Sequence, residues 1–171
     1  MNQQQNRLLA IDPGTKEIGV AVFKEADLIY YGVKTIRDRS TAQRMLVQAS
    51  DLIKDLVAAY QPQFFAIERM FVVQKSAALL CVLADEMKTT ARGYGLPIFE
   101  YFPSVIRKEL CNSGKATKRD VAEMVAARYR ELGRFLNSQT SWEEKYYANI
   151  FDAVAVGLRA RIDVLKQPLP F

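Results

Sequence analysis

Three acidic side chains lie at positions where an exposed charge is not the simplest explanation. Asp12 ends the apolar run LLAID, Glu68 ends the apolar run FFAIE, and Asp152 lies inside the apolar stretch NIFDAVAVGL. A buried carboxylate without a partner is strongly destabilising, so each group needs a cation or hydrogen-bond donors. Oxygen ligands without histidine or thiolate favour Mg²⁺ or Mn²⁺ over zinc. Two such ions about 4 Å apart could activate water and stabilise the leaving oxygen in phosphodiester hydrolysis.

Each acid has a simpler explanation when it is considered alone. Asp12 could accept backbone N–H groups in its own turn. Glu68 could pair with Arg69, and Asp152 could pair with a core-facing lysine or arginine. The three acids together indicate a metal site much more specifically than any one of them.

The composition limits the chemistry that the chain can perform. It has 171 residues and no histidine, which excludes Ser-His-Asp and Cys-His catalysis and any histidine-ligated metal. Two cysteines, Cys81 and Cys111, are too few for a disulfide framework or a zinc site, and we expect them to be reduced and mostly buried. The net charge of +5 suits a polyanionic partner but does not establish one.

The chain also lacks the usual membrane signals. No apolar stretch is long enough to span a bilayer, and the start, MNQQQNR, contains no signal-peptide core. We therefore expect a soluble, cytoplasmic protein with no membrane partner.

The hydrophobic pattern predicts one α/β domain over residues 1–171, with flexible ends at about 1–6 and 167–171. Three consecutive strands form an antiparallel meander, and they are expected at Leu8–Asp12, Ile18–Phe23 and Leu28–Ile36. Pro13 and Gly14 suit the central positions of a type II turn between the first two strands.

The remaining pattern predicts helices that alternate with two further strands. A helix capped by Ser40 or Thr41 ends before Pro62, and it is followed by a strand at 64–67, a helix at about 75–92 and a strand at 97–102. Further helices are expected to start at Pro103 and Thr117 and after a capping box of Ser141 and Glu144. The predicted fold is a five-stranded mixed sheet flanked by helices, which is the ribonuclease H-like arrangement.

This arrangement would bring two of the acids together. With two-residue periodicity, Asp12 shares a strand face with Leu8 and Ala10, and Glu68 shares one with Phe64 and Ala66. If the two strands are parallel neighbours, both carboxylates emerge at the same end of the sheet, where the sites of α/β proteins usually lie.

Five segments together resemble the RuvC-type Holliday junction resolvases. They are AIDPGTKEIGVAVF, FFAIERMFVVQKSAALL, LPIFEYFPSVIRKEL, KATKRDVAEMV and FDAVAVGL, and the resemblance covers roughly Leu8 to Arg161. It implies a homodimeric endonuclease for recombination and repair that binds four-way DNA junctions, nicks two strands symmetrically with two Mg²⁺ or Mn²⁺ ions per active site, and can partner a branch-migration complex.

The resemblance also implies roles for individual residues. Asp12, Glu68 and Asp152 match three catalytic acids, Phe71 matches an aromatic that stacks on bases at the junction centre, and Lys118 matches a catalytic basic residue near the scissile phosphate. Other cations suit a phosphate track around these groups, and they are Arg69, Lys75, Arg107, Lys108, Lys115 and Arg119. From the residues alone, Phe71 could equally lie in the core, and the lysines could form a solvated helix end.

One position departs from the family pattern. The family has a fourth ligand three residues before the last aspartate, and this chain has Asn149 there. The i, i+3 spacing keeps Asn149 and Asp152 on one helix face, so an amide oxygen could still bind the metal as a neutral, weaker ligand. The alternatives are that another acid such as Glu144 substitutes for it, or that cleavage is weakened.

These observations leave two functions open. The first is a metal-dependent junction-resolving nuclease, and the second is a junction-binding protein that cuts poorly. The opening DPGT also resembles the phosphate loop of actin-like ATPases and the start of ribosomal-RNA-processing nucleases. Those classes rank lower, because the chain lacks a second phosphate loop and because such nucleases lack the AIERMFVVQK block.

Overall fold

A five-stranded mixed sheet forms the centre of the computed structural model, which describes residues 6–71, 75–137 and 139–166. The strand order is β3-β2-β1-β4-β5, and the strands are β1 (Arg7–Asp12), β2 (Glu17–Lys24), β3 (Asp27–Thr35), β4 (Phe64–Glu68) and β5 (Ile98–Tyr101). The first three strands are antiparallel neighbours, whereas β4 runs parallel to both β1 and β5. The predicted meander and the parallel central pair are therefore confirmed.

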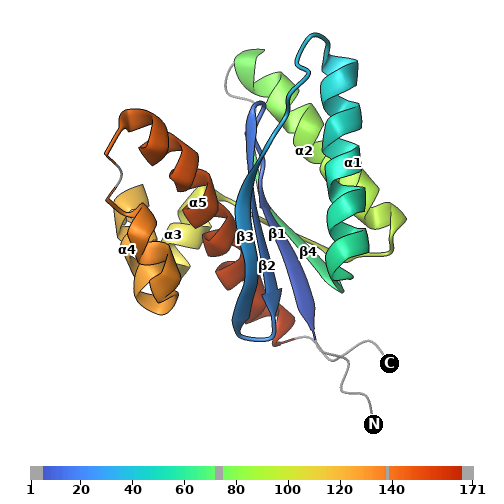
Figure 1. Cartoon of the computed structure of the whole chain (residues 1–171). Helices are drawn as coiled ribbons and strands as arrows, with labels where there is room; N and C mark the ends of the chain where they lie inside the picture. Colours follow the sequence, from blue (N-terminus) through green and yellow to red (C-terminus); the bar gives the residue numbers. More distant parts are fainter. Residues whose placement is uncertain (1–5, 72–74, 138, 167–171) are drawn as a thin grey trace.

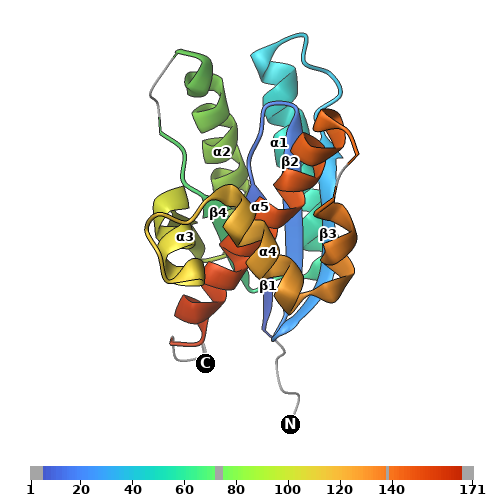
Figure 2. The same ribbon diagram turned by 90° about the vertical axis from the view of Figure 1, so that its left-hand side faces the viewer.

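Helices cover both faces of this sheet (Figure 1). They are α1 (Ala42–Tyr60), α2 (Lys75–Gly93), α3 (Pro103–Cys111), α4 (Lys118–Arg128), a short 3₁₀ helix (Arg130–Phe135) and α5 (Ser141–Val164). Helices α1 and α2 pack on one face, and α5 packs on the other with α3 and α4 outside it (Figure 2). Among the described residues, no helix is long and apolar enough to cross a membrane.

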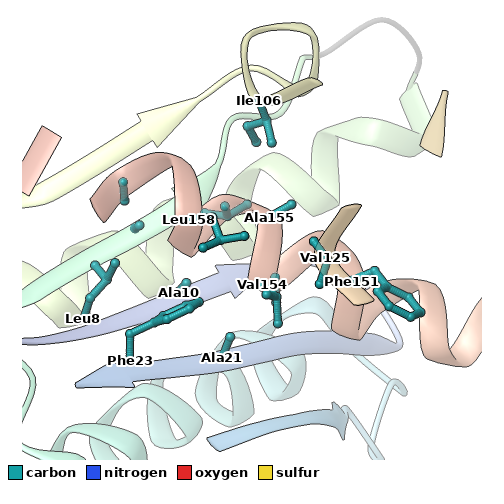
Figure 3. Packing of buried hydrophobic residues seen from close by; sticks show 14 of the residues in the cluster. Leu8, Ala10, Ala21, Phe23, Ile106, Val125, Phe151, Val154, Ala155 and Leu158 are labelled. Atoms are coloured by element: carbon teal, nitrogen blue, oxygen red, sulfur yellow. The ribbon is translucent and has the colours of Figure 1, made fainter. Parts of the chain in front are cut away.

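Alternate residues of each strand enter two separate hydrophobic cores. Leu9 and Ile11 of β1 pack with α1 and α2, whereas Leu8 and Ala10 pack with α5. Figure 3 shows the second core, in which Val154, Ala155 and Leu158 of α5 lie against the sheet. Because Asp12 follows Ala10 by two residues, its side chain belongs to the face that α5 covers.

Small residues allow α5 to lie close to this face. A Cβ atom on Gly19 of β2 would overlap the backbone carbonyl oxygen of Asn149, and a Cβ atom on Gly157 would overlap the ring of Phe23. The closeness of α5 to β2 therefore depends on glycine at both contacts.

The structure corrects the predicted capping box of the last helix. The box consists of Thr140 and Glu143 and not of Ser141 and Glu144, so α5 is capped one residue earlier than expected. Thr140 accepts a hydrogen bond from the Glu143 backbone N–H, and the Glu143 carboxylate accepts one from the Thr140 N–H. The same i, i+3 spacing occurs in both pairs, so the sequence pattern alone could not choose the register. The predicted caps Thr41 and Thr117 are confirmed.

The structure also corrects the predicted type II turn. Gly14 does not adopt the positive φ angle that the second central position of such a turn requires. Glycine is needed at position 14 for a different reason, because a Cβ atom there would overlap the carbonyl oxygen of Glu17. Both cysteines are free as expected, although each is only partly buried.

Candidate active site at the carboxyl end of the central strands

Two carboxylates meet where β1 and β4 end. Ile11 and Ile67 are register partners in the parallel pair, so Asp12 and Glu68 follow them at the same end of the sheet. Asp152 approaches from α5, whose neighbouring residues Phe151, Ala153 and Val154 are buried. The expectation that Asp12 and Glu68 emerge at the same end of the sheet is confirmed, and Asp152 of α5 lies close enough to act on the charge of both.

Burial and the repulsion of neighbouring carboxylates make Asp12 and Glu68 hard to ionise. Asp12 is only 8% exposed, and burial, followed by the charges of Asp152 and Glu68, holds its pKa well above the usual range despite the attraction of Lys118. Burial and the charge of Asp152 raise the pKa of Glu68 to about 7, against the opposing effect of Lys118 and Arg107. The site therefore has fewer cations than its carboxylates need.

Lys118 supplies part of the missing positive charge. Its Nζ donates a hydrogen bond to Oδ2 of Asp152 at 2.8 Å. Burial lowers the pKa of Lys118, but the charge of Asp152 and its hydrogen bond, with smaller effects of Asp12 and Glu68, raise it overall. The lysine side chain remains 71% exposed, so its ammonium group lies at the solvent side of the acidic cluster.

The structure decides between the simpler explanations of each acid. No hydrogen-bond donor in the described part of the chain reaches the Asp12 carboxylate, so this acid does not cap its own turn. Arg69 does not pair with Glu68, because its guanidinium group lies over the ring of Phe102. Among the described residues, Asp152 alone of the three acids has a cationic partner, Lys118, and this lysine is exposed and not core-facing as the simpler explanation required.

A small cation fits the chemistry of this donor set. Asp12 is a buried carboxylate without a hydrogen-bond donor, and two further carboxylates lie close enough to raise its pKa. The adjacent cleft encloses about 20 Å³, room for about one water molecule, and its lining includes Glu68, Lys118 and Asp152. Among the described residues, however, no three acidic or thiol side chains are already close enough to enclose a metal. The metal site stays a prediction that requires the carboxylates to move together.

Asn149 is held by its own helix. Its Nδ2 atom donates to the carbonyl oxygens of Lys145 and Tyr146, at 3.1 and 3.2 Å. The amide oxygen is therefore the atom that remains available as a ligand. Glu144 lies exposed on the first turn of α5, two turns before Asp152, and lines a different hollow together with Lys118 and Asp152.

An aromatic pair lies beside Glu68. Phe71 is 59% exposed and its ring stacks on that of Phe102, with centroids 4.4 Å apart and planes inclined by 4°. The guanidinium carbon of Arg69 lies 4.7 Å from the centre of the Phe102 ring. Phe71 is therefore exposed as its expected role requires and does not lie in the core.

The other predicted cations differ in their placement. Arg107 of α3 lines the cleft with Glu68 and Asp152, and its Nε atom is buried without a hydrogen-bond partner. Lys108 and Lys115 are exposed. Arg119 is exposed but already binds Glu123 and the carbonyl oxygen of Leu136. Lys75 begins α2, and its side chain lies outside the part that the structure describes.

Sequence reasoning missed Phe102 and Gly19. Phe102 lies between β5 and the Pro103 that begins α3, and only the pairing of β4 with β5 brings it to Phe71. Gly19 contacts α5 across the sheet, where a local sequence pattern carries no signal.

Comparisons with known proteins identify the family of the chain and agree with its fold. The family model for "Crossover junction endodeoxyribonuclease RuvC" matches residues 8–158. The protein of that name from Synechococcus sp. (strain WH7803) is 33% identical over 125 residues, which are 70% of this chain and 80% of that protein. The one from Pasteurella multocida is 29% identical over 159 residues, 88% of this chain and 76% of that protein. The solved structure of T. thermophilus RuvC in complex with a Holliday junction substrate has the same fold, with a TM-score of 0.71 at 21% identity and coverage of 94% of this chain and 96% of that chain.

Proposed function

This chain belongs to the RuvC family of crossover junction endodeoxyribonucleases, and we propose that it resolves four-way DNA junctions by two symmetric, metal-dependent nicks. The observation that carries the proposal is the group of three carboxylates at the end of β1 and β4, one of them buried and without a hydrogen-bond donor in the described part of the chain. Burying Asp12 beside two other carboxylates costs free energy that the one ion pair of the group, Lys118 with Asp152, does not offset. Such a group serves a nuclease that neutralises it with divalent cations.

Asp12, Glu68 and Asp152 would hold the cations, with the amide oxygen of Asn149 as a neutral fourth ligand. Two bound Mg²⁺ or Mn²⁺ ions would supply a nucleophilic water at neutral pH and stabilise the leaving oxygen. The carboxylates would determine where the cations bind, and thereby where the reacting phosphate binds.

In this scheme Lys118 binds the Asp152 carboxylate in the free protein and a phosphate of the DNA in the complex. In the protein alone its ammonium group binds Asp152. With a cation held at Asp152, the same group would be free to donate to a phosphate oxygen, because its side chain already lies at the solvent side of the site. Lys118 would then orient the scissile phosphate and stabilise the charge that develops on it.

The surroundings suit a nucleic acid whose bases are partly unstacked. Phe71 offers an exposed aromatic face on which a base can stack, and exposed Arg69, Lys108 and Lys115 can contact the phosphates on either side. Symmetric nicking of a four-way junction requires two such sites related by a twofold axis, so we propose that the active species is a homodimer.

The second function is a junction-binding protein with weak nuclease activity. Asn149 favours it, because the neutral amide attracts a cation less than an aspartate would. Both functions predict a stable complex with junction DNA, and only the nuclease converts it to nicked duplexes.

An end-labelled four-way junction incubated with Mg²⁺ or Mn²⁺ distinguishes the two. Symmetric nicks by the natural chain and none by Asp12→Asn establish the nuclease, whereas a shifted complex without nicks in either metal establishes the binder. Linear duplex of the same sequence is the control for junction selectivity. Equal affinity for the linear duplex and the junction would contradict both functions.

A further inference from the structure

Phe102 contacts both of the exposed groups that border Glu68. Its ring stacks on Phe71 with nearly parallel planes, and the guanidinium group of Arg69 lies over the same ring. Phe102 itself is only partly exposed and lies at the base of this group, whereas the ring of Phe71 faces solvent. The three side chains form one unit, which we call the Phe102 stack.

The backbone beneath this stack is fixed on both sides. The N–H of Arg69 donates to the carbonyl of Tyr101 at 2.8 Å, which extends the pairing of β4 with β5 past Glu68. The carbonyl of Phe102 accepts from Val105 and Ile106 at 2.9 and 3.1 Å, because Phe102 is the N-cap of α3. Phe102 therefore has a rigid base, and Phe71 follows the end of the strand without belonging to one.

An exposed aromatic side chain without such a neighbour would sample several rotamers, and binding a base would require it to give up that freedom. A parallel ring at 4.4 Å selects one orientation in advance and covers one face of Phe71, which is still 59% exposed, so the opposite face is the one left for a base. A base that stacks on that face continues the column, and the base-stacking free energy is then not reduced by ordering the phenyl ring.

We infer that Phe102 is a positioning residue, which holds Phe71 and Arg69 so that an unpaired base and its phosphate are captured next to Glu68. The inference rests on the proposed function, because it takes junction DNA as the ligand. It adds a residue that touches neither the metal ligands nor the reacting phosphate and acts through the stack.

The test compares Phe102→Leu with Phe71→Leu in the full-length protein, bound to a four-way junction with 2-aminopurine at the crossover. Binding is measured in EDTA, so that no strand is cut, and affinity is compared with that for linear duplex. We expect each variant to lose the change in 2-aminopurine fluorescence and about tenfold of the preference for junction over duplex, which is the loss of roughly one stacked base. The double variant should not lose a further tenfold, since the two rings act as one unit.

Two further variants separate positioning from folding. Phe99→Leu truncates a phenyl ring on the same strand, β5, that packs against Phe64 and not against Phe71, so it should retain the fluorescence change. Phe102→Tyr keeps the ring and should restore both readouts. Thermal unfolding identifies a temperature at which all variants are folded.

The outcomes distinguish the inference from the proposed function. Normal fluorescence and selectivity for Phe102→Leu, with both lost for Phe71→Leu, would overturn the role of Phe102 and leave base capture by Phe71 intact. Failure of the natural chain to prefer the junction would overturn the proposed function and the inference with it. Loss in Phe99→Leu equal to that in Phe102→Leu would show that the effect comes from the fold and would also overturn the inference.

Discussion

Lys118 Nζ lies 2.8 Å from Asp152 Oδ2, although Lys118 begins α4 and Asp152 lies in the middle of α5. The ion pair places a protein cation at the position where a metal ion would neutralise the same carboxylate. In this chain a divalent cation must therefore compete with a lysine before it can bind Asp152.

Replacement of Lys118 by methionine separates the two roles of this lysine. We expect Mn²⁺ to bind about tenfold more tightly, because Asp152 no longer has a competing cation. Nicking of the junction should nevertheless fall by at least about a hundredfold, since the phosphate loses a charged hydrogen-bond donor. Calorimetric titration and single-turnover cleavage measure the two effects. Arg119→Met is the matched control, because Arg119 lies next in the chain and binds Glu123 instead of a site carboxylate. Weaker metal binding in Lys118→Met would show that the lysine does not compete.

Removal of one carboxylate should stabilise the metal-free protein. Asp12→Asn relieves the burial of a charge and its repulsion by Asp152 and Glu68, so the free energy of unfolding in EDTA at pH 8 should rise by about 1 to 2 kcal/mol. The same change should remove the rise in Tm that Mg²⁺ causes in the natural chain and should abolish nicking. Differential scanning fluorimetry with and without Mg²⁺ tests this, with Asp51→Asn as a control, since Asp51 is an exposed acid on α1. A lower Tm for Asp12→Asn in EDTA would mean that the carboxylates do not repel one another.

The metal-free protein should lose stability as the pH rises. Glu68 has a pKa of about 7 in the folded chain against an ordinary value of 4.5. Between these values the folded state therefore holds a proton that the unfolded chain has released. The contribution of Glu68 to the free energy of unfolding should thus fall from about pH 4.5 to about pH 7, by about 3 kcal/mol, and level off above that.

Urea denaturation at several pH values in EDTA measures this slope. Metal competes with the proton, so Mg²⁺ affinity and nicking rate should both increase up to about pH 7. Glu68→Gln should flatten the stability profile while an exposed acid changed to its amide, such as Asp51→Asn, leaves it intact. A stability that rises with pH over this range in EDTA would contradict the assignment to Glu68.

Asn149→Asp should strengthen metal binding. The substitution adds a negative charge at the fourth ligand position, and we expect Mn²⁺ affinity to rise by about tenfold. It also removes the hydrogen bonds from Nδ2 to the carbonyls of Lys145 and Tyr146, so the metal-free protein should be less stable by about 1 kcal/mol. Glu144→Gln is the control, and a loss of metal affinity in that variant would identify Glu144 as the substitute ligand. Equal Mn²⁺ requirements for the natural chain and Asn149→Asp would contradict this prediction.

Gly19→Ala should disrupt the active site although Gly19 is not one of the proposed metal ligands. The added methyl group would overlap the carbonyl oxygen of Asn149, which pushes α5 and Asp152 away from Asp12. We expect a loss of about 3 kcal/mol in stability and a large loss of nicking. Gly93→Ala is a matched control, because a Cβ atom there meets no atom within 4 Å, and its stability should be unchanged or slightly higher. Chemical denaturation and junction cleavage of the two variants test this, and equal behaviour would show that the contact of α5 with β2 is adaptable.

The sequence by itself determined the elements and the identity of the acids. Short apolar runs such as LLAID and FFAIE indicate strands that are buried on both faces, and an acid that ends each run lies at the same edge once the strands are parallel. These features are local, because strand periodicity and helix spacing depend on residues a few positions apart. The capping box of α5 shows the limit, since Thr140 with Glu143 and Ser141 with Glu144 differ by one residue and carry the same pattern.

The tertiary structure decided what each acid faces. Asp152 binds Lys118 across 34 positions of the chain, Asp12 has no hydrogen-bond donor among the described residues, and Phe71 stacks on a ring 31 positions later. Such contacts arise from the packing of α5 and α4 and from the pairing of β4 with β5, and nothing in the local sequence records them. A pKa or an ion pair depends on distances between distant segments, so the sequence determined which groups could form the site, and only the fold decided which of them are paired.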